Sequence, residues 1–222
     1  EFLIHLPLYN ELETILIGIK ADSHISSCTN DFSTDKPVVF YGTSITQGAS
    51  ASRPGLAYPS IISRRLNVET INLGFSGNGH FENSIGDILC KTETAAFVLD
   101  CTPNSSPKII SKNAEELIIK LNKCHPNTPV LLVESPIRSF ANFQKQETSI
   151  HGGIAYIQAQ NQALNDVFIK AKKKGIENIF YLKSDSLLGI DSEAIVDGTH
   201  LNDLGMLRIS NAIGAKISEI LE

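Results

Sequence analysis

The chain has 222 residues, a length typical of one large α/β domain. Hydrophobic residues make up 42% of it and charged residues 19%, which predicts a globular protein with a sizeable core. Its formal net charge of −5 excludes the basic surface that nucleic-acid binding requires. We therefore expect no nucleic-acid partner. No apolar run is long enough to span a bilayer, so we expect no membrane span either.

The first residues alternate between apolar and other side chains, as a half-buried strand does. The alternating apolar residues are Phe2, Ile4, Leu6 and Leu8. A turn-like Tyr9-Asn10-Glu11 and a second apolar run follow, so we predict a β-hairpin over residues 1–22. A lone hairpin is marginal in water and must pack on something. Residues 23–36 are rich in Ser, Thr, Asn and Asp, which predicts a linker.

From residue 37 onward, short apolar runs alternate with segments of helical periodicity. We expect strands at 38–41, 68–72, 95–100, 129–134 and 178–182. We expect helices at 57–66, 83–90, 108–123, 154–174 and 203–221, the last capped by Asn202 or Asp203. This order predicts one α/β domain over 37–222, with a central parallel sheet between two helical layers, in the flavodoxin-like manner.

Two polar segments fall at the same predicted edge of the sheet. Ser44 follows the first strand of the α/β domain, and Asp197 and His200 precede the last helix. A carboxylate three residues before a histidine can hold the imidazole in one tautomer, leaving the other nitrogen to act on a serine. Taken singly, the serine is more often a helix cap and the Asp–His pair a loop hydrogen bond. Their shared edge makes them candidates for one catalytic site.

These segments resemble the conserved blocks of the SGNH hydrolases, also called the GDSL family of esterases and lipases. The run Gly42-Thr43-Ser44-Ile45-Thr46-Gln47-Gly48 resembles the first block, and Asn72-Leu73-Gly74-Phe75-Ser76-Gly77 the second. The end of strand 95–100 resembles the third block, and Asp197-Gly198-Thr199-His200 the last. The resemblance implies that Ser44 is the nucleophile, His200 the base and Asp197 the residue that orients the base.

The resemblance also implies an oxyanion hole formed by the N–H groups of Ser44 and Gly77 and by the side chain of Asn104. Asn78 is a competing amide donor, or else a turn residue. We favour Asn104, because it follows a strand end and occurs in the expected order.

Two positions depart from the family pattern. Thr43 stands where the family has an aspartate, and the third block reads Thr102-Pro103-Asn104-Ser105 instead of Gly-x-Asn-Asp. Both changes leave the proposed catalytic atoms in place.

The amino-terminal run also resembles the tail of a β-sandwich that precedes the catalytic domain in one bacterial subgroup of this family. The resemblance implies that residues 1–22 are the remnant of an accessory β-sandwich and that 37–222 are the catalytic domain. It favours an exported protein, periplasmic or extracellular, over a cytoplasmic one.

The function that follows is a serine esterase for short acyl esters, acetyl esters above all, with acetylated carbohydrates as one substrate class. Such chemistry uses no metal and no organic cofactor. A short-chain preference is expected because no large apolar lid is evident. Two alternatives are acyl transfer to an alcohol acceptor through the same acyl-enzyme, and a non-catalytic carbohydrate-binding module. The presence of Ser44, Asp197 and His200 together argues against the module.

The remaining reactive side chains receive ordinary structural interpretations. The cysteines are far apart and have no paired spacing, so we expect separate thiols. They are Cys28, Cys90, Cys101 and Cys124, and Cys101 is expected to be a packed small apolar residue.

Three histidines lack the spacing of metal ligands, and we expect them to be solvated loop residues. They are His80, His125 and His151. Arg138 and His151 lie in the polar loop after the fourth strand of the α/β domain, where contact with substrate is conceivable, but we expect an ordinary exposed loop.

Overall fold

The computed structural model describes residues 2–26, 31–144 and 152–222. Its centre is a parallel sheet of five strands in the order β2-β1-β3-β4-β5. The strands are β1 (Val38–Gly42), β2 (Thr70–Gly74), β3 (Ala96–Asp100), β4 (Val130–Val133) and β5 (Ile179–Leu182). Because all strands point the same way, their carboxyl ends share one edge of the sheet, and the loops there are brought together.

The strands send alternate side chains into two separate cores, as the period of two residues in a strand requires. In β1, Val39 and Tyr41 enter one core, whereas Val38 and Phe40 enter the other. All five residues of β1 are buried. A sheet buried on both faces reads as a continuous apolar run in the sequence, which is why the strands were predictable.

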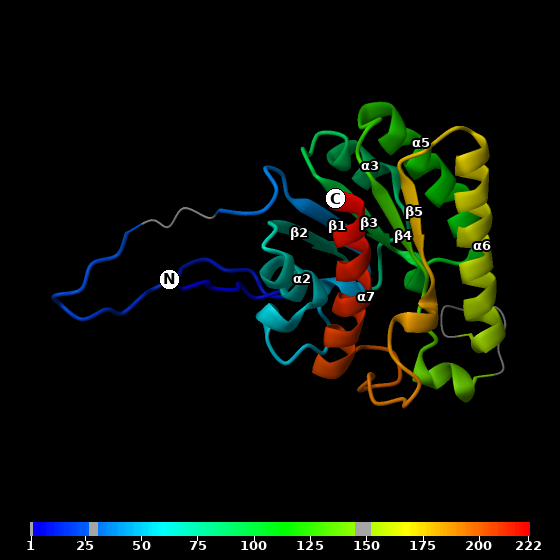
Figure 1. The fold of residues 1–222 in the computed structure, drawn as a ribbon. Helices are drawn as coiled ribbons and strands as arrows, with labels where there is room; N and C mark the ends of the chain where they lie inside the picture. The colour runs from blue at the N-terminus through cyan, green and yellow to red at the C-terminus, as the bar shows by residue number, and fades with distance from the viewer. Residues whose placement is uncertain (1, 27–30, 145–151) are drawn as a thin grey trace.

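Helices cover both faces of the sheet, giving three layers (Figure 1). The helices α2 (Tyr58–Leu66) and α7 (Asp203–Leu221) pack together over one face. The helices α3 (Asn83–Leu89), α5 (Glu115–Cys124) and α6 (Ile154–Lys173) cover the other. Shorter helices are α1 (Ser44–Gln47) and α4 (Pro107–Ile109). In the described ranges, no helix is both long and apolar enough to cross a membrane.

The predicted α/β order is confirmed, with small shifts in boundaries. Strand β2 begins at Thr70 and ends at Gly74, two residues later than expected, because it pairs in register with β1 up to Gly42 and Gly74. The helix expected at 108–123 consists of α4, a π-helical turn at Ile110–Ala114, and α5. The predicted Asn202 cap of α7 is present, since its Oδ1 accepts the Gly205 N–H at 3.0 Å.

The predicted hairpin at 1–22 is not confirmed. Residues 2–26 contain no strand, and the part of this segment beyond residue 9 extends away from the sheet (Figure 1). Phe2 and Leu16 are 97% and 92% exposed. Of the alternating apolar residues, Phe2, Ile4 and Leu6 are exposed and only Leu8 is half-buried, and a hairpin that buries so little apolar surface is marginal.

The expectation of separate thiols is wrong for two cysteines. Cys90, which caps the carboxyl end of α3, forms a disulfide with Cys124 at the end of α5. A separation of 34 residues does not indicate a disulfide in the sequence. The two cysteines meet because α3 packs on α5. Cys101 is buried and free, as expected, and Cys28 lies outside the described residues.

Candidate active site

Ser44 stands where the central strand turns into a helix. Strand β1 ends at Gly42, Thr43 is the N-cap, and Ser44 is the first residue of α1. The Thr43 hydroxyl accepts the Ile45 N–H at 3.2 Å, so this threonine satisfies a helix-end donor, as an aspartate does in this position. Ser44 is 6% exposed. The departure at residue 43 thus preserves the local turn that presents Ser44.

Asp197 and His200 lie in a closed loop just before α7. Residues Ile195 and Leu201 form an isolated antiparallel bridge, and the Val196 N–H donates to the His200 carbonyl at 3.0 Å. The Asn202 cap then begins α7 two residues after His200. The loop is therefore held at both ends, which limits how far the imidazole can move.

The three predicted residues form one hydrogen-bonded chain. Ser44 Oγ lies 3.0 Å from His200 Nε2. His200 Nδ1 lies 2.6 Å from Asp197 Oδ2. With Nδ1 protonated and donating to the carboxylate, Nε2 faces the serine as a proton acceptor. This arrangement can remove the proton of Ser44 and make its oxygen a nucleophile.

The carboxylate of Asp197 is stabilised in its ionised form. Burial opposes ionisation, but the backbone N–H and the ring of His200 and the backbone N–H of Thr199 together lower the pKa of Asp197 to about 2. The Thr199 and His200 N–H groups both donate to Oδ1, at 2.9 and 2.6 Å. Oδ2 is thereby aimed at the imidazole. With this pKa, the carboxylate is ionised at neutral pH.

The loop Gly74–Gly79 lies next to Asn104. Gly77 has a φ of +70°, a conformation that favours glycine. The Asn104 side-chain amide donates to the Asn78 carbonyl at 2.6 Å, whereas the Asn78 amide donates within its own loop, to Ser76 O at 3.2 Å. An amide nitrogen carries two hydrogens, so Asn104 keeps a second N–H for another acceptor. The structure thus places Asn104 against the loop that carries Gly77.

A buried carboxyl group, which the sequence analysis missed, supports α1. Asp100, at the end of β3, is 1% exposed, and its Oδ2 accepts from the hydroxyls of Thr46 at 2.9 Å and Tyr58 at 3.0 Å. Burial raises its pKa to about 7, against the lowering effect of these two hydrogen bonds. An aspartate ending an otherwise apolar strand was the available signal.

Asn72 is a second missed residue. Its Nδ2 donates to the Thr46 carbonyl and its Oδ1 accepts the Gly74 N–H, both at 2.9 Å. One amide therefore joins α1 to the start of the Gly74–Gly79 loop. A polar residue inside the apolar strand β2 was the signal.

Three expectations about loop residues need correction. Arg138 is 2% exposed, not solvated, and its guanidinium lies 5.1 Å from the ring centre of Phe140. Burial lowers the pKa of Arg138 to about 10. His80 has a buried Nδ1, and the His125 ring lies 3.1 Å from the Leu89 carbonyl oxygen. His151 lies outside the described residues.

A doubly wound parallel sheet with this Ser–His–Asp geometry at its carboxyl edge defines an α/β protein of the SGNH type. Comparison with family models identifies it more closely. Residues 35–218 match the model of the GDSL-like Lipase/Acylhydrolase family, and the chain belongs to that family.

Solved structures agree with this assignment. A Bacteroides ovatus protein described as a GDSL-like lipase is 39% identical, with a TM-score of 0.84 over 91% of this chain and 58% of its own. The salicylyl-acyltransferase SsfX3 of a tetracycline biosynthetic pathway is 17% identical, with a TM-score of 0.72 over 85% and 56%. A family two carbohydrate esterase from Clostridium thermocellum, solved with cellohexaose, is 14% identical, with a TM-score of 0.65 over 84% and 65%.

The chain thus spans somewhat more than half the length of these structures. The last two, below 25% identity, show a common fold alone. No curated protein matches the sequence.

Proposed function

We propose that this protein is a serine esterase that cleaves short acyl esters through Ser44, His200 and Asp197. The observation that carries the proposal is the 3.0 Å approach of Ser44 Oγ to His200 Nε2, with Asp197 bound to the other ring nitrogen. The family provides the class of chemistry, since it contains lipases and acylhydrolases.

The first half of the reaction forms an acyl-enzyme. His200 Nε2 takes the hydroxyl proton of Ser44, and Oγ attacks the ester carbonyl carbon to give a tetrahedral intermediate. When the intermediate collapses, the bond to the alcohol oxygen breaks, and His200 returns the proton to that oxygen. The alcohol leaves, and the acyl group stays on Ser44. Asp197 stabilises the imidazolium that exists between the two proton transfers.

The negative oxygen of the intermediate needs fixed donors. We assign this role to the N–H groups of Ser44 and Gly77 and to the second side-chain N–H of Asn104. The bond from Asn104 to the Asn78 carbonyl supports this choice over Asn78, because it holds the Asn104 amide beside the Gly77 loop. Loss of one such donor typically costs about 10²- to 10³-fold in kcat.

The second half releases the acid. A water molecule gives a proton to His200 Nε2 and attacks the acyl carbonyl carbon. The acyl–Oγ bond then breaks, Ser44 recovers the proton, and the carboxylic acid leaves. Every step uses the side chains already described.

Acetylated carbohydrates are the substrate class that we favour. The supporting observation is the likeness in fold to carbohydrate acetylesterases, including one from Sinorhizobium meliloti. Acyl transfer is the second candidate, supported by the likeness to a salicylyl-acyltransferase. The two reactions share the acyl-enzyme and differ in whether water or another hydroxyl removes the acyl group.

Hydrolysis of p-nitrophenyl acetate tests the proposal. We expect turnover by the wild type and a loss of at least about 10⁴-fold in Ser44→Ala. Ser52→Ala is the matched control, since Ser52 is an exposed serine a few residues away. Equal rates in wild type and Ser44→Ala would refute the serine mechanism. Product analysis with and without an added sugar acceptor then separates hydrolysis from transfer.

We also propose that the protein works in an oxidising, exported compartment. The supporting observation is the disulfide between Cys90 and Cys124, because such bonds persist mainly outside the reducing cytosol. Mass spectrometry of the protein isolated from its natural host, with free thiols alkylated before reduction, tests this proposal. Alkylation of both cysteines before reduction would contradict it.

A further inference from the structure

Gln47, the last residue of α1, joins two segments that are far from it in the sequence. Its Oε1 accepts the Ser76 N–H at 2.8 Å, and its Nε2 donates to the Leu8 carbonyl at 2.9 Å. One partner is a donor and the other an acceptor, so the amide fits in one orientation alone. Gln47, three residues after Ser44, therefore acts as a clamp between residue 8 and the Gly74–Gly79 loop.

The loop needs such a clamp at Gly77. A side-chain carbon placed on Gly77 would meet no atom within 4 Å, so packing does not hold this residue. The local restraints are hydrogen bonds of its two neighbours. On the Asn78 side, the Asn78 N–H donates to the Phe75 carbonyl at 3.0 Å, and the two asparagine amides described above also bind there. On the Ser76 side, the bond from the Ser76 N–H to Gln47 links the loop to α1. The direction of the Gly77 N–H thus depends on how Ser76 is held.

The amino-terminal segment is anchored at the other end of the clamp. Leu8 is half-buried although most of its neighbours are exposed. Its side chain packs against Gly48, where an added Cβ would lie 2.6 Å from Leu8 Cδ1 and where φ is +102°. The Tyr9 hydroxyl lies near the Ser76 side chain, which lowers the pKa of Tyr9 against the larger raising effect of burial. Leu8 and Tyr9, two adjacent residues of the segment, therefore contact Gln47 and Ser76.

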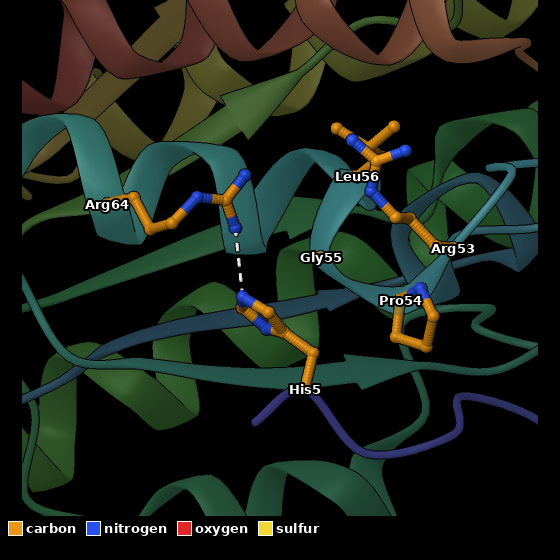
Figure 2. A pocket seen from close by; sticks show the side chains of 6 residues that line it. All are labelled: His5, Arg53, Pro54, Gly55, Leu56 and Arg64. Carbon is orange, nitrogen blue, oxygen red and sulfur yellow. Dashed lines mark hydrogen bonds between the residues drawn. The ribbon is translucent and has the colours of Figure 1, made fainter. Parts of the chain in front are cut away.

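A third anchor lies a short way along the segment. His5 Nε2 lies 3.0 Å from Arg64 Nη1, and His5 projects toward α2 at a pocket beside Gly55 (Figure 2). A side-chain carbon on Gly55 would lie 2.8 Å from the His5 ring, so glycine permits this approach. Residues 5–9 are thus fixed on the body of the protein at three places.

We propose that Gln47 is a positioning residue that couples residues 5–9 to the Gly77 N–H, so that the amino-terminal segment helps to set the rate of the reaction at Ser44. The inference rests on the proposed function, since Gly77 matters for rate if it binds the oxyanion. Gln47 acts through Ser76 and Gly77, and the fit of the ground-state substrate does not depend on it.

The central variant is Gln47→Met, which keeps the length of the side chain and removes both hydrogen bonds. We expect kcat for p-nitrophenyl acetate to fall about tenfold, with KM changed less than about twofold, because a misplaced donor affects the transition state more than the bound substrate. We expect amide exchange in residues 74–79 to quicken about fivefold, the effect of losing one ordinary hydrogen bond. Gln162→Met is the control, since exposed Gln162 donates to Asp166 on α6.

Leu8→Ala tests the coupling from the other side and covers the case in which Gln47→Met does not fold. It removes the side-chain packing that holds the Leu8 carbonyl beside Gln47, so we expect it to lower kcat as well. The double variant should lose little more than Gln47→Met alone, because both changes weaken the same linkage. Fully additive losses would overturn the coupling. A kcat of Gln47→Met equal to that of Gln162→Met would overturn the proposal.

The two proposals fail in different ways. If the wild type shows no hydrolysis that depends on Ser44, the proposed function fails. Amide exchange still tests in that case whether Gln47 holds the loop. An unchanged exchange rate in residues 74–79 of Gln47→Met would show that it does not.

Discussion

At the scale of single residues, the carboxylate of Asp197 is half-exposed and yet accepts several hydrogen bonds. Its side chain is 49% exposed, yet three N–H groups from Thr199 and His200 donate to it. These donors keep the charge in place and aim one oxygen at the imidazole. In the proposed mechanism, the carboxylate therefore orients the base and stabilises its protonated form.

Asp197→Asn should lower kcat by about 10³- to 10⁴-fold while the protein stays folded. The asparagine can still accept from the two backbone N–H groups, but an amide N–H facing Nδ1 would favour the wrong tautomer. The kinetics of ester hydrolysis and a thermal melt check this. Asp191→Asn removes a carboxylate from a nearby segment, where it binds Arg208, and should keep near-normal kcat. A loss below tenfold in Asp197→Asn would contradict the assigned role.

Asp100 makes the stability of the protein depend on pH. Burial raises its pKa to about 7 in the folded state, whereas the unfolded chain has an ordinary aspartate. The folded state therefore binds the proton more tightly, and the stabilising contribution is lost as pH rises from about 4 to about 7.

Asp100→Asn removes this dependence because asparagine does not titrate. The free energy of unfolding of the variant, relative to wild type, should rise by about 2–3 kcal/mol between pH 5 and pH 8. Urea denaturation at the two pH values measures it. If the free energy of unfolding changed equally with pH in the wild type and in Asp100→Asn, Asp100 would have an ordinary pKa.

At the scale of elements, the site and the disulfide lie at opposite edges of the sheet. Ser44, Gly77 and Asn104 follow the carboxyl ends of β1, β2 and β3, whereas Cys90 and Cys124 precede β3 and β4. The disulfide joins the ends of α3 and α5, so it restrains the helical layer without touching the site.

Replacing both cysteines by serine should lower the free energy of unfolding by about 3–4 kcal/mol, the loop-closure value for a link of 34 residues. Urea denaturation measures the loss, and the rate of ester hydrolysis below the transition should stay near the wild-type value. A large loss of activity in the folded variant would mean that the two edges are coupled.

At the scale of the whole molecule, the parallel sheet gathers at one edge the candidate site residues, which come from four separate segments of the chain. The Gly74–Gly79 loop and the turn Thr102–Asn104 are short, and their one exposed large apolar side chain is Phe75, at 37%. They offer little apolar surface to a long acyl chain, and each buried CH₂ is worth about 0.8 kcal/mol. We therefore expect a preference for small acyl groups.

A series of p-nitrophenyl esters from acetate to octanoate tests this preference. The value of kcat/KM should be highest for acetate and should fall along the series. A panel of acetylated sugars, with released acetate as readout, extends the test to the alcohol side. Faster turnover of octanoate than acetate would contradict the short-chain assignment.

The sequence by itself determined the order of strands and helices, because buried parallel strands read as apolar runs and helices as periodic ones. It also pointed to Ser44, Asp197 and His200, because short motifs place them at strand and helix ends. Tertiary structure alone decided what depends on distant contacts. These are the pairing of Cys90 with Cys124, the burial of Arg138 and Asp100, the lack of strands in residues 2–26, and the Gln47 clamp. Local pattern carries no information on which remote groups meet, since packing of the whole chain sets those distances.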